Sequence, residues 1–150
     1  MSDPPLRPEL DAVLRASPLL DGAELLDWGP GWANVRRVAP GAAGNVAGTV
    51  SGGVLLTLAD AAFEAACNGH GRQAVALELT AHFPSAGLPG ETLTAVATEV
   101  ARGRRTASYR IDVAGGDPPQ PRLVVMALAY RTSRWHLGEE AWPPEWVATH

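Results

Sequence analysis

The 150-residue chain contains no lysine, and all twelve of its basic residues are arginine. This absence excludes the Walker A phosphate loop, Schiff-base chemistry and a Ser-Lys dyad, because each of them depends on a lysine amine. Acidic residues outnumber basic ones by 16 to 12, which gives a formal charge of -4. A nucleic-acid interface needs a basic surface that neutralises phosphates. We therefore expect no nucleic-acid partner.

Cysteine is almost absent as well. Cys67 is the only one, and the four histidines are widely scattered, so neither a disulfide framework nor a zinc site is expected. The longest apolar stretch, residues 52–66, is interrupted by Asp60 and Glu64 and is too short to span a bilayer. No secretory signal opens the sequence. We expect a cytoplasmic protein that has no membrane span and no resident metal or cofactor.

Length and composition predict one domain over residues 1–150, large enough to hold a core without disulfides. Residues 1–8 contain three prolines and are expected to form a loose arm. Residues 133–150 carry three tryptophans among prolines and acids. This tail is expected to pack back on the body of the protein.

A central helix is predicted at Val54–Cys67, which is rich in leucine and alanine and contains no glycine or proline. The glycine-rich loop 40–53 precedes it, and Asn68-Gly69 is suited to its end. Nearly every face of this helix is apolar, so we expect it to be buried all round.

Six apolar runs separated by glycine, proline or charged turns are predicted to be strands. They are residues 23–28, 32–38, 74–83, 91–101, 106–113 and 123–132. A short helix from Pro8 to near Pro18 precedes them. No helix interrupts the last four runs, which indicates an antiparallel sheet. One buried helix and one sheet predict an α+β domain in which the sheet wraps the helix.

Asp60 places a carboxylate in the middle of this apolar helix. Such a position is costly unless the group is paired, protonated or used in a reaction. One interpretation is a structural aspartate bonded to an arginine or a backbone amide. The other is a catalytic acid or base.

The start of the same helix is a second candidate. Gly52 and Gly53 supply N–H groups that the helix leaves unpaired, and the helix dipole adds partial positive charge there, so this end could hold an oxyanion. The alternative is that Ser51 simply caps the helix and the glycines allow close packing.

The spacing between these candidates constrains their use. Asp60 lies two helical turns, about 10 Å, beyond Gly53, which is too far for both to act on one carbonyl within one chain. Two antiparallel helices in a two-fold dimer would bring the start of one helix to the middle of the other.

Asn45, Ser51-Gly52-Gly53 and Leu58-Ala59-Asp60 together resemble the signature of hotdog-fold acyl-CoA thioesterases of the phenylacetate-degradation (PaaI) type. The resemblance covers about residues 20–132. It implies a hotdog fold, a homodimer with shared sites that pairs into a dimer of dimers, and a coenzyme A thioester as substrate. It also implies that Asp60 is general base or nucleophile, that the Gly52 amide, with Gly53 adjacent, polarises the carbonyl, and that Asn45 positions carbonyl or water.

This chain departs from the family pattern at three positions. Ser51 stands where the family has histidine, and Ala76 where a serine or threonine is frequent. Glu64 lies one turn beyond Asp60 on the same helix face, where two carboxylates would raise the pKa of one of them. The alternative for Glu64 is an exposed or arginine-paired side chain.

Further residues are expected to contact the substrate: Ser51, Gly53, Leu56, Phe63, Glu64, Arg102, Arg104 and Arg105. The three arginines lie at a turn between predicted strands, where they could meet the phosphates of coenzyme A or form only a solvated charged turn.

Cys67 is expected to be an inert core thiol. Ser51 lacks the frame of a hydrolase nucleophile elbow, and His82 is expected on an outer face or near the pocket rim.

Thioester hydrolysis needs few polar groups. Its leaving thiolate has a conjugate acid with a pKa of about 8.5, so little acid catalysis is required. We therefore expect an acyl-CoA thioesterase acting on small or medium acyl groups, aromatic ones included. The alternatives are a non-catalytic acyl-CoA binding or sensing domain, and a hotdog hydratase or dehydratase, which would want a histidine near the site.

Overall fold

The computed structural model describes residues 2–150. Its six strands form one antiparallel sheet in the order β1-β2-β4-β5-β6-β3. The strands are β1 (Glu24–Gly29), β2 (Trp32–Val38), β3 (Arg72–His82), β4 (Thr92–Arg102), β5 (Thr106–Gly115) and β6 (Gln120–Trp135). The helices are α1 (Arg7–Arg15), α2 (Gly52–Asn68) and α3 (Pro144–Thr149), with 3-10 turns η1 (Pro18–Leu20) and η2 (Glu139–Ala141).

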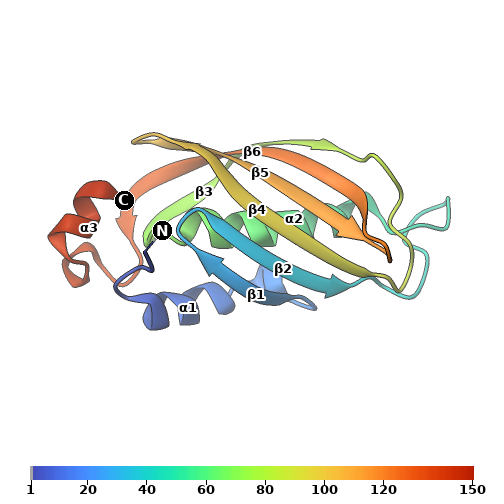
Figure 1. Cartoon of the computed structure of the whole chain (residues 1–150), viewed down its shortest axis with the longest axis horizontal. Coiled ribbons are helices and arrows are strands. Elements are labelled where there is room, and N and C mark those ends of the chain that lie inside the picture. Colours follow the sequence, from blue (N-terminus) through green and yellow to red (C-terminus); the bar gives the residue numbers. More distant parts are fainter. Residues whose placement is uncertain (1) are drawn as a thin grey trace.

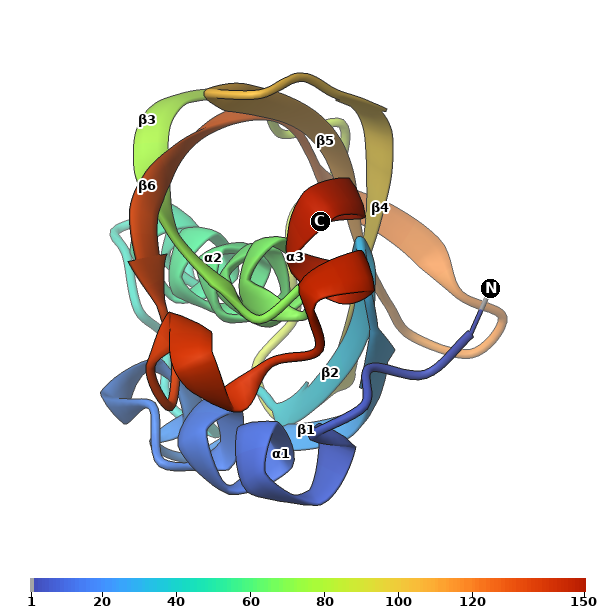
Figure 2. The ribbon, with the colours of Figure 1, turned by 90° about the vertical axis from the view of Figure 1, so that its left-hand side faces the viewer.

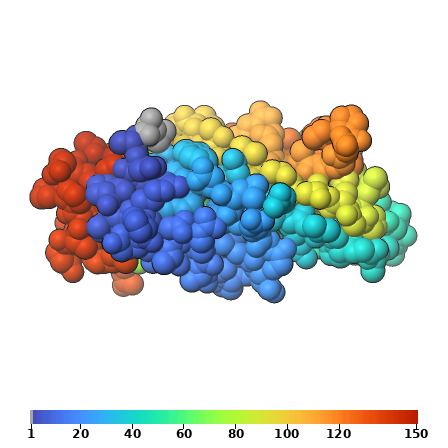
Figure 3. All heavy atoms as spheres, turned by 60° about the horizontal axis from the view of Figure 1, so that its bottom comes forward, coloured from blue at the N-terminus to red at the C-terminus, as the bar shows by residue number. Residues whose placement is uncertain are grey.

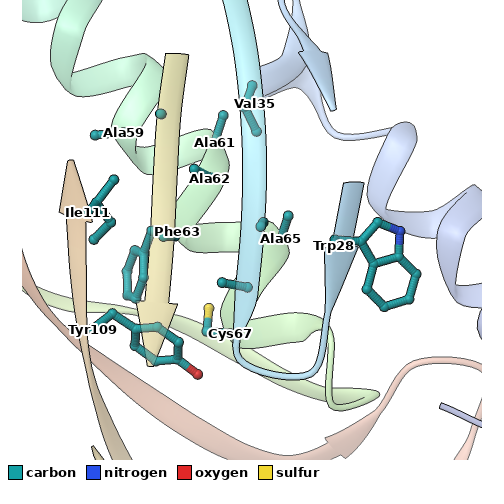
Figure 4. Close-up of a cluster of buried hydrophobic side chains, with 14 of the residues drawn as sticks. Trp28, Val35, Ala59, Ala61, Ala62, Phe63, Ala65, Cys67, Tyr109 and Ile111 are labelled. Atoms are coloured by element: carbon teal, nitrogen blue, oxygen red, sulfur yellow. The ribbon is translucent and has the colours of Figure 1, made fainter. Parts of the chain in front are cut away.

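The sheet curls around α2, as Figures 1 and 2 show. Its inner face follows the alternation expected of strands with one buried side. In β5, for example, Ala107, Tyr109, Ile111 and Val113 are buried and alternate with less buried residues. Figure 4 shows Phe63 of α2 pointing toward Tyr109 and Ile111. The predicted α+β domain with a sheet wrapped around one helix is confirmed.

The expectation that α2 is buried all round is wrong. Its core-facing side is closed by the sheet, but a stripe at helical spacing stays partly or fully open, and it contains Gly53, Thr57, Asp60 and Glu64. The reason is that the sheet covers α2 on one side only, so the polar residues of the helix gather on the side that the sheet does not reach.

The strand β3 stands at the end of the sheet order, so one of its edges has no neighbour among the strands of residues 2–150. Apolar side chains are nevertheless exposed along it, including Val75 at 55% and Leu77 at 59%. An exposed apolar edge strand is a template for pairing with another chain. It runs beside α2 (Figure 2), and Val75 of β3 lines one pocket together with Glu64 of the open stripe.

Both terminal segments pack at the same end of the molecule, whereas the loop before α2 lies at the opposite end (Figures 1 and 3). The tail packs back on the body as predicted: Trp142 and Trp146 are buried, and the Trp146 indole donates to the His70 carbonyl at 2.8 Å. The first eight residues are not all a loose arm, because α1 already begins at Arg7. Within residues 2–150 we find no helix both long and apolar enough to cross a membrane.

Candidate active site

The start of α2 presents free hydrogen-bond donors. The Ser51 hydroxyl accepts from the Val54 N–H at 3.3 Å. Ser51 therefore caps the helix, as the alternative to an oxyanion site predicted. Gly52 and Gly53 follow it as the first helical residues, where the helix provides no acceptors for their N–H groups. No hydrogen bond found within residues 2–150 uses either of them. Two donors with partial positive charge therefore remain available to an oxyanion.

Asn45 organises the loop that leads to this helix start. Its side-chain oxygen accepts from the N–H groups of Ala47 and Thr49 at 3.1 and 3.0 Å. Its amide nitrogen donates to the Thr49 hydroxyl at 2.8 Å and to the Val50 carbonyl at 3.4 Å. The Asn45 side chain thus holds the loop in shape.

A pocket of about 340 Å³ joins Asn45 to Gly52. It is lined by Asn45, Thr49, Val50, Gly52, Leu55, Phe83, Ser85, Ala86 and Gly87. The Phe83 ring lies so close to Gly52 that a Cβ at this position would sit 3.2 Å from it. Sequence reasoning did not single out Phe83, which it placed at the end of the predicted strand 74–83; in the structure this large apolar side chain stays exposed directly after β3.

Asp60 is half-buried on the open stripe of α2. Burial raises the pKa of its carboxyl above the ordinary value, and the negative charge of Glu64 raises it further. Within residues 2–150 no arginine or backbone amide forms a hydrogen bond or ion pair with the Asp60 carboxylate. The structural interpretation of Asp60, which required such a partner, is therefore not supported by the structure.

Glu64 lies one turn beyond Asp60 on the same stripe, and it too lacks an ion-pair partner among the described residues. It lines a second pocket of about 300 Å³ between α1, the second half of α2 and the start of β3. The other lining residues are Val13, Leu14, Ala16, Ser17, Pro18, Asn68, Gln73, Ala74, Val75 and His136. Sequence reasoning did not find this pocket, because its walls come from four separate segments.

Two groups of predicted site residues emerge. Asn45 and Gly52 share the pocket at the helix start, whereas Asp60 lies on the stripe about 10 Å further along the axis and Glu64 lies one turn beyond Asp60. Asp60 lines neither pocket. One chain therefore does not assemble both groups around a single carbonyl.

Phe63 is misassigned as a substrate contact. It is 1% exposed and packs edge-on against Tyr109, with ring centroids 5.4 Å apart, because position 63 faces the sheet rather than the open stripe. Leu56 is partly buried and packs against the core. Gly53 is exposed at the helix start.

We expect Phe63→Ala to lower the free energy of unfolding by about 3–5 kcal/mol, since it leaves a cavity in the core. Chemical denaturation measures this loss. The control is Leu56→Ala, at a half-buried position, which should cost less. A variant of normal stability and altered substrate preference would instead restore Phe63 to the binding site.

The three predicted phosphate contacts separate in the structure. Arg102 and Arg104 line a pocket under the C-terminal residues, whereas Arg105 does not. This hairpin lies at the opposite end of the molecule from the loop that carries Asn45 (Figure 1).

The remaining residues singled out in the sequence have no visible chemical role. Cys67 is buried, which raises the pKa of its thiol and keeps it inert. His82 is exposed at the end of β3, and Ala76 pairs with Ala129 of β6. Among residues 2–150 no group of three or more possible metal-ligating side chains comes together.

The family model described as "Thioesterase superfamily" matches residues 47–121, which is half of the chain. A Deinococcus radiodurans protein provisionally named an esterase is 38% identical over 134 residues, covering 89% of this chain and 90% of that protein. The acyl-coenzyme A thioesterase PaaI of Escherichia coli is 36% identical over 92 residues, covering 61% of this chain and 66% of that protein.

Solved structures of related proteins also match the fold of this chain. The structure of the E. coli PaaI protein from the phenylacetic acid degradation operon matches with a TM-score of 0.78 and 27% identity, over 84% of this chain and 92% of that chain. The TT0310 protein of Thermus thermophilus matches with a TM-score of 0.72 and 32% identity, over 77% of this chain and 98% of that chain. This chain therefore belongs to the thioesterase superfamily, a family of thioester hydrolases, and is a hotdog-fold member of the PaaI type.

Proposed function

We propose that the protein hydrolyses small or medium acyl-CoA thioesters, aromatic ones included, to a free acid and coenzyme A. The observation that carries this proposal is the unpartnered, half-buried Asp60 carboxylate on an otherwise apolar helix. A carboxylate kept there without a cation is costly to the fold, which is the arrangement expected of a reactive group. The name of the E. coli relative, an acyl-coenzyme A thioesterase, supports the choice of substrate.

In the proposed reaction, the carbonyl oxygen accepts from the Gly52 amide, and Gly53 lies beside it. Asp60 either removes a proton from the attacking water, or attacks the carbonyl itself and expels the thiolate to form a mixed anhydride, which water then hydrolyses to the free acid and the Asp60 carboxylate. Asn45 keeps the loop next to Gly52 in place and helps to position carbonyl or water. The thiolate leaves without needing a strong general acid, so no cofactor is required.

The proposed site is shared between two copies of the chain. Asp60 of one protomer and Gly52 of its partner would meet if two α2 helices lay antiparallel across a two-fold axis. The exposed apolar edge of β3, beside the open stripe of α2, supports pairing of this kind. The exposed Met126 and Tyr130 on the outer face of β6 provide a surface on which two such dimers could associate.

Release of free thiol from a panel of acyl-CoA esters tests the proposed activity. We expect turnover of at least one ester, with aliphatic and aromatic acyl groups of increasing size compared at the same concentration. Tight binding of the esters without thiol release would support the non-catalytic acyl-CoA binding domain instead, an alternative motivated by the missing polar groups at Ser51 and Ala76.

The pH dependence of this reaction follows from the pKa of Asp60. The carboxyl must be ionised to act, so kcat/KM should fall as the pH drops through its raised pKa, above the value of about 4 that is usual for aspartate. Glu64→Gln removes the second cause of the shift. We therefore expect the acid limb of the pH profile to move to lower pH in this variant.

Profiles of kcat/KM against pH for the wild type and Glu64→Gln measure this effect. The matched control is Glu139→Gln, which removes an exposed acid from η2 and should leave the acid limb in place. An unchanged limb in Glu64→Gln would show that Glu64 does not influence the reacting group.

A further inference from the structure

A largely buried ion pair is connected to the pocket that joins Asn45 to Gly52. The side chains of Glu91 and Arg122 are 8% and 9% exposed. Glu91 directly precedes β4, and Arg122 lies near the start of β6. The guanidinium of Arg122 donates from Nε to Oε1 of Glu91 and from Nη2 to Oε2, both at 2.9 Å. The reaction proposed above uses neither residue.

This ion pair leaves one guanidinium nitrogen free for a third partner. Nη1 of Arg122 donates to the Ser85 hydroxyl at 2.9 Å, and this hydroxyl donates to the Pro121 carbonyl. The Leu88 N–H donates to Oε1 of Glu91 at 3.0 Å. Burial alone would raise the pKa of Glu91, but the hydrogen bonds from Arg122 and Leu88 and the charge of Arg122 hold that pKa below its ordinary value. The network therefore stays ionised at neutral pH.

The network ties the connection between β3 and β4, residues 83–91, to β6, because both Ser85 and Glu91 belong to this connection. Two-pronged, charge-assisted hydrogen bonds fix geometry. A buried ion pair adds little to stability when it is compared with well-packed apolar side chains of the same volume. The effect expected of the Glu91–Arg122 pair is therefore on the position of the connection.

The first part of the connection forms a wall of the pocket. Four residues within 83–87 line it together with Gly52. Pro84 fixes its own φ and restricts the backbone of Phe83 to extended conformations, so an anchor at Ser85 also determines where Phe83 lies. The Phe83 ring is the part of the wall that packs closely against Gly52.

We propose that Glu91 and Arg122 are positioning residues for the oxyanion donor. Their ion pair holds Ser85 in place, and through Ser85 it holds the Phe83 ring against Gly52. An apolar ring at this place keeps water away from the Gly52 N–H, and a donor stabilises an oxyanion more strongly where water is excluded. The catalytic effect rests on the proposed function, whereas the placement of the ring does not.

The NMR resonance of the Gly52 N–H tests the placement of the ring without requiring hydrolysis. An aromatic ring shifts the resonances of protons beside it, so Phe83→Leu shows how much of the Gly52 shift the ring causes. Ser85→Ala removes the link between the ion pair and the wall, and it should move the Gly52 resonance in the same direction. The matched control is Ser133→Ala, which removes an exposed hydroxyl near the other end of β6 and should leave the resonance in place.

Kinetics test the catalytic effect. The double variant Glu91→Leu/Arg122→Met removes both charges together, so no unpaired charge remains and the free energy of unfolding should stay close to that of the wild type. We expect kcat for an acyl-CoA to fall roughly tenfold and KM to change by less than about twofold, because the donor acts mainly on the transition state. Ser85→Ala should also lower kcat, and it should not slow the double variant further, since both changes break the same link.

An unchanged Gly52 resonance in Ser85→Ala and in the double variant would overturn the proposal, whether or not the protein is a thioesterase. It would also be overturned if the resonance moved while both variants kept the kcat of the wild type. If the wild type releases no thiol but Ser85→Ala moves the resonance, the placement of the ring is supported and the proposed function fails instead.

Discussion

Asp60→Asn is expected to reduce kcat for thioester hydrolysis by about 100-fold or more, the effect of removing a general base or nucleophile. The amide keeps the size and shape of the side chain but can neither accept the proton of water nor attack the carbonyl. Thiol release under saturating acyl-CoA measures the change.

Stability measurements separate this effect from a failure to fold. Because burial and Glu64 raise the pKa of Asp60, the ionised group destabilises the folded state once the pH exceeds that pKa. The neutral amide removes this cost, so Asp60→Asn should melt at or above the Tm of the wild type near pH 7. A stable variant with full activity would rule out Asp60 as the reacting group.

A mixture of two inactive variants is expected to recover activity if the site is shared. Gly52→Pro removes the N–H donor at the first helical position, where proline is accepted. Ser51 already has the extended φ of -62° and ψ of 146° that a residue before proline requires. Loss of this oxyanion donor alone should lower kcat by about 10²–10³-fold.

Equal amounts of Gly52→Pro and Asp60→Asn, refolded together, should regain about a quarter of wild-type activity, because half of the dimers are mixed and each has one intact site of two. Gly52→Ala is the matched control, because it keeps the N–H while it brings the same Cβ to 3.2 Å from the Phe83 ring. A mixture no more active than its separate components would place the whole site within one chain.

Much of the fold was predictable from periodicity and turn residues. The apolar alternation of residues 106–113 and the glycine-free run before Asn68-Gly69 identified a buried strand and the central helix, which became β5 and α2. The predicted boundaries of the strands and of α2 differ from the observed ones by a few residues. The difference is largest in β6, which continues into the expected tail as far as Trp135. The continuation depends on pairing with β3, a contact between distant parts of the sequence.

The candidate site was predictable to a smaller extent. Asp60 stood out because a carboxylate interrupts an apolar helix, and Gly52 because helix starts leave N–H groups free. Phe63 was assigned wrongly because the sequence does not show which face of a nearly uniform apolar helix meets the sheet. Arg131, which is 7% exposed on the inner face of β6, had a signal that was overlooked: a charged residue stands where the alternation of β6 calls for an apolar one.

Pairing of two chains along the free edge of β3, as proposed, would make catalysis depend on protein concentration. If an intact reaction centre requires two molecules, dilution below the dissociation constant should turn the enzyme off, and specific activity would then rise with protein concentration before reaching a plateau. Expression level would thus act as a control on turnover, without any effector or covalent modification.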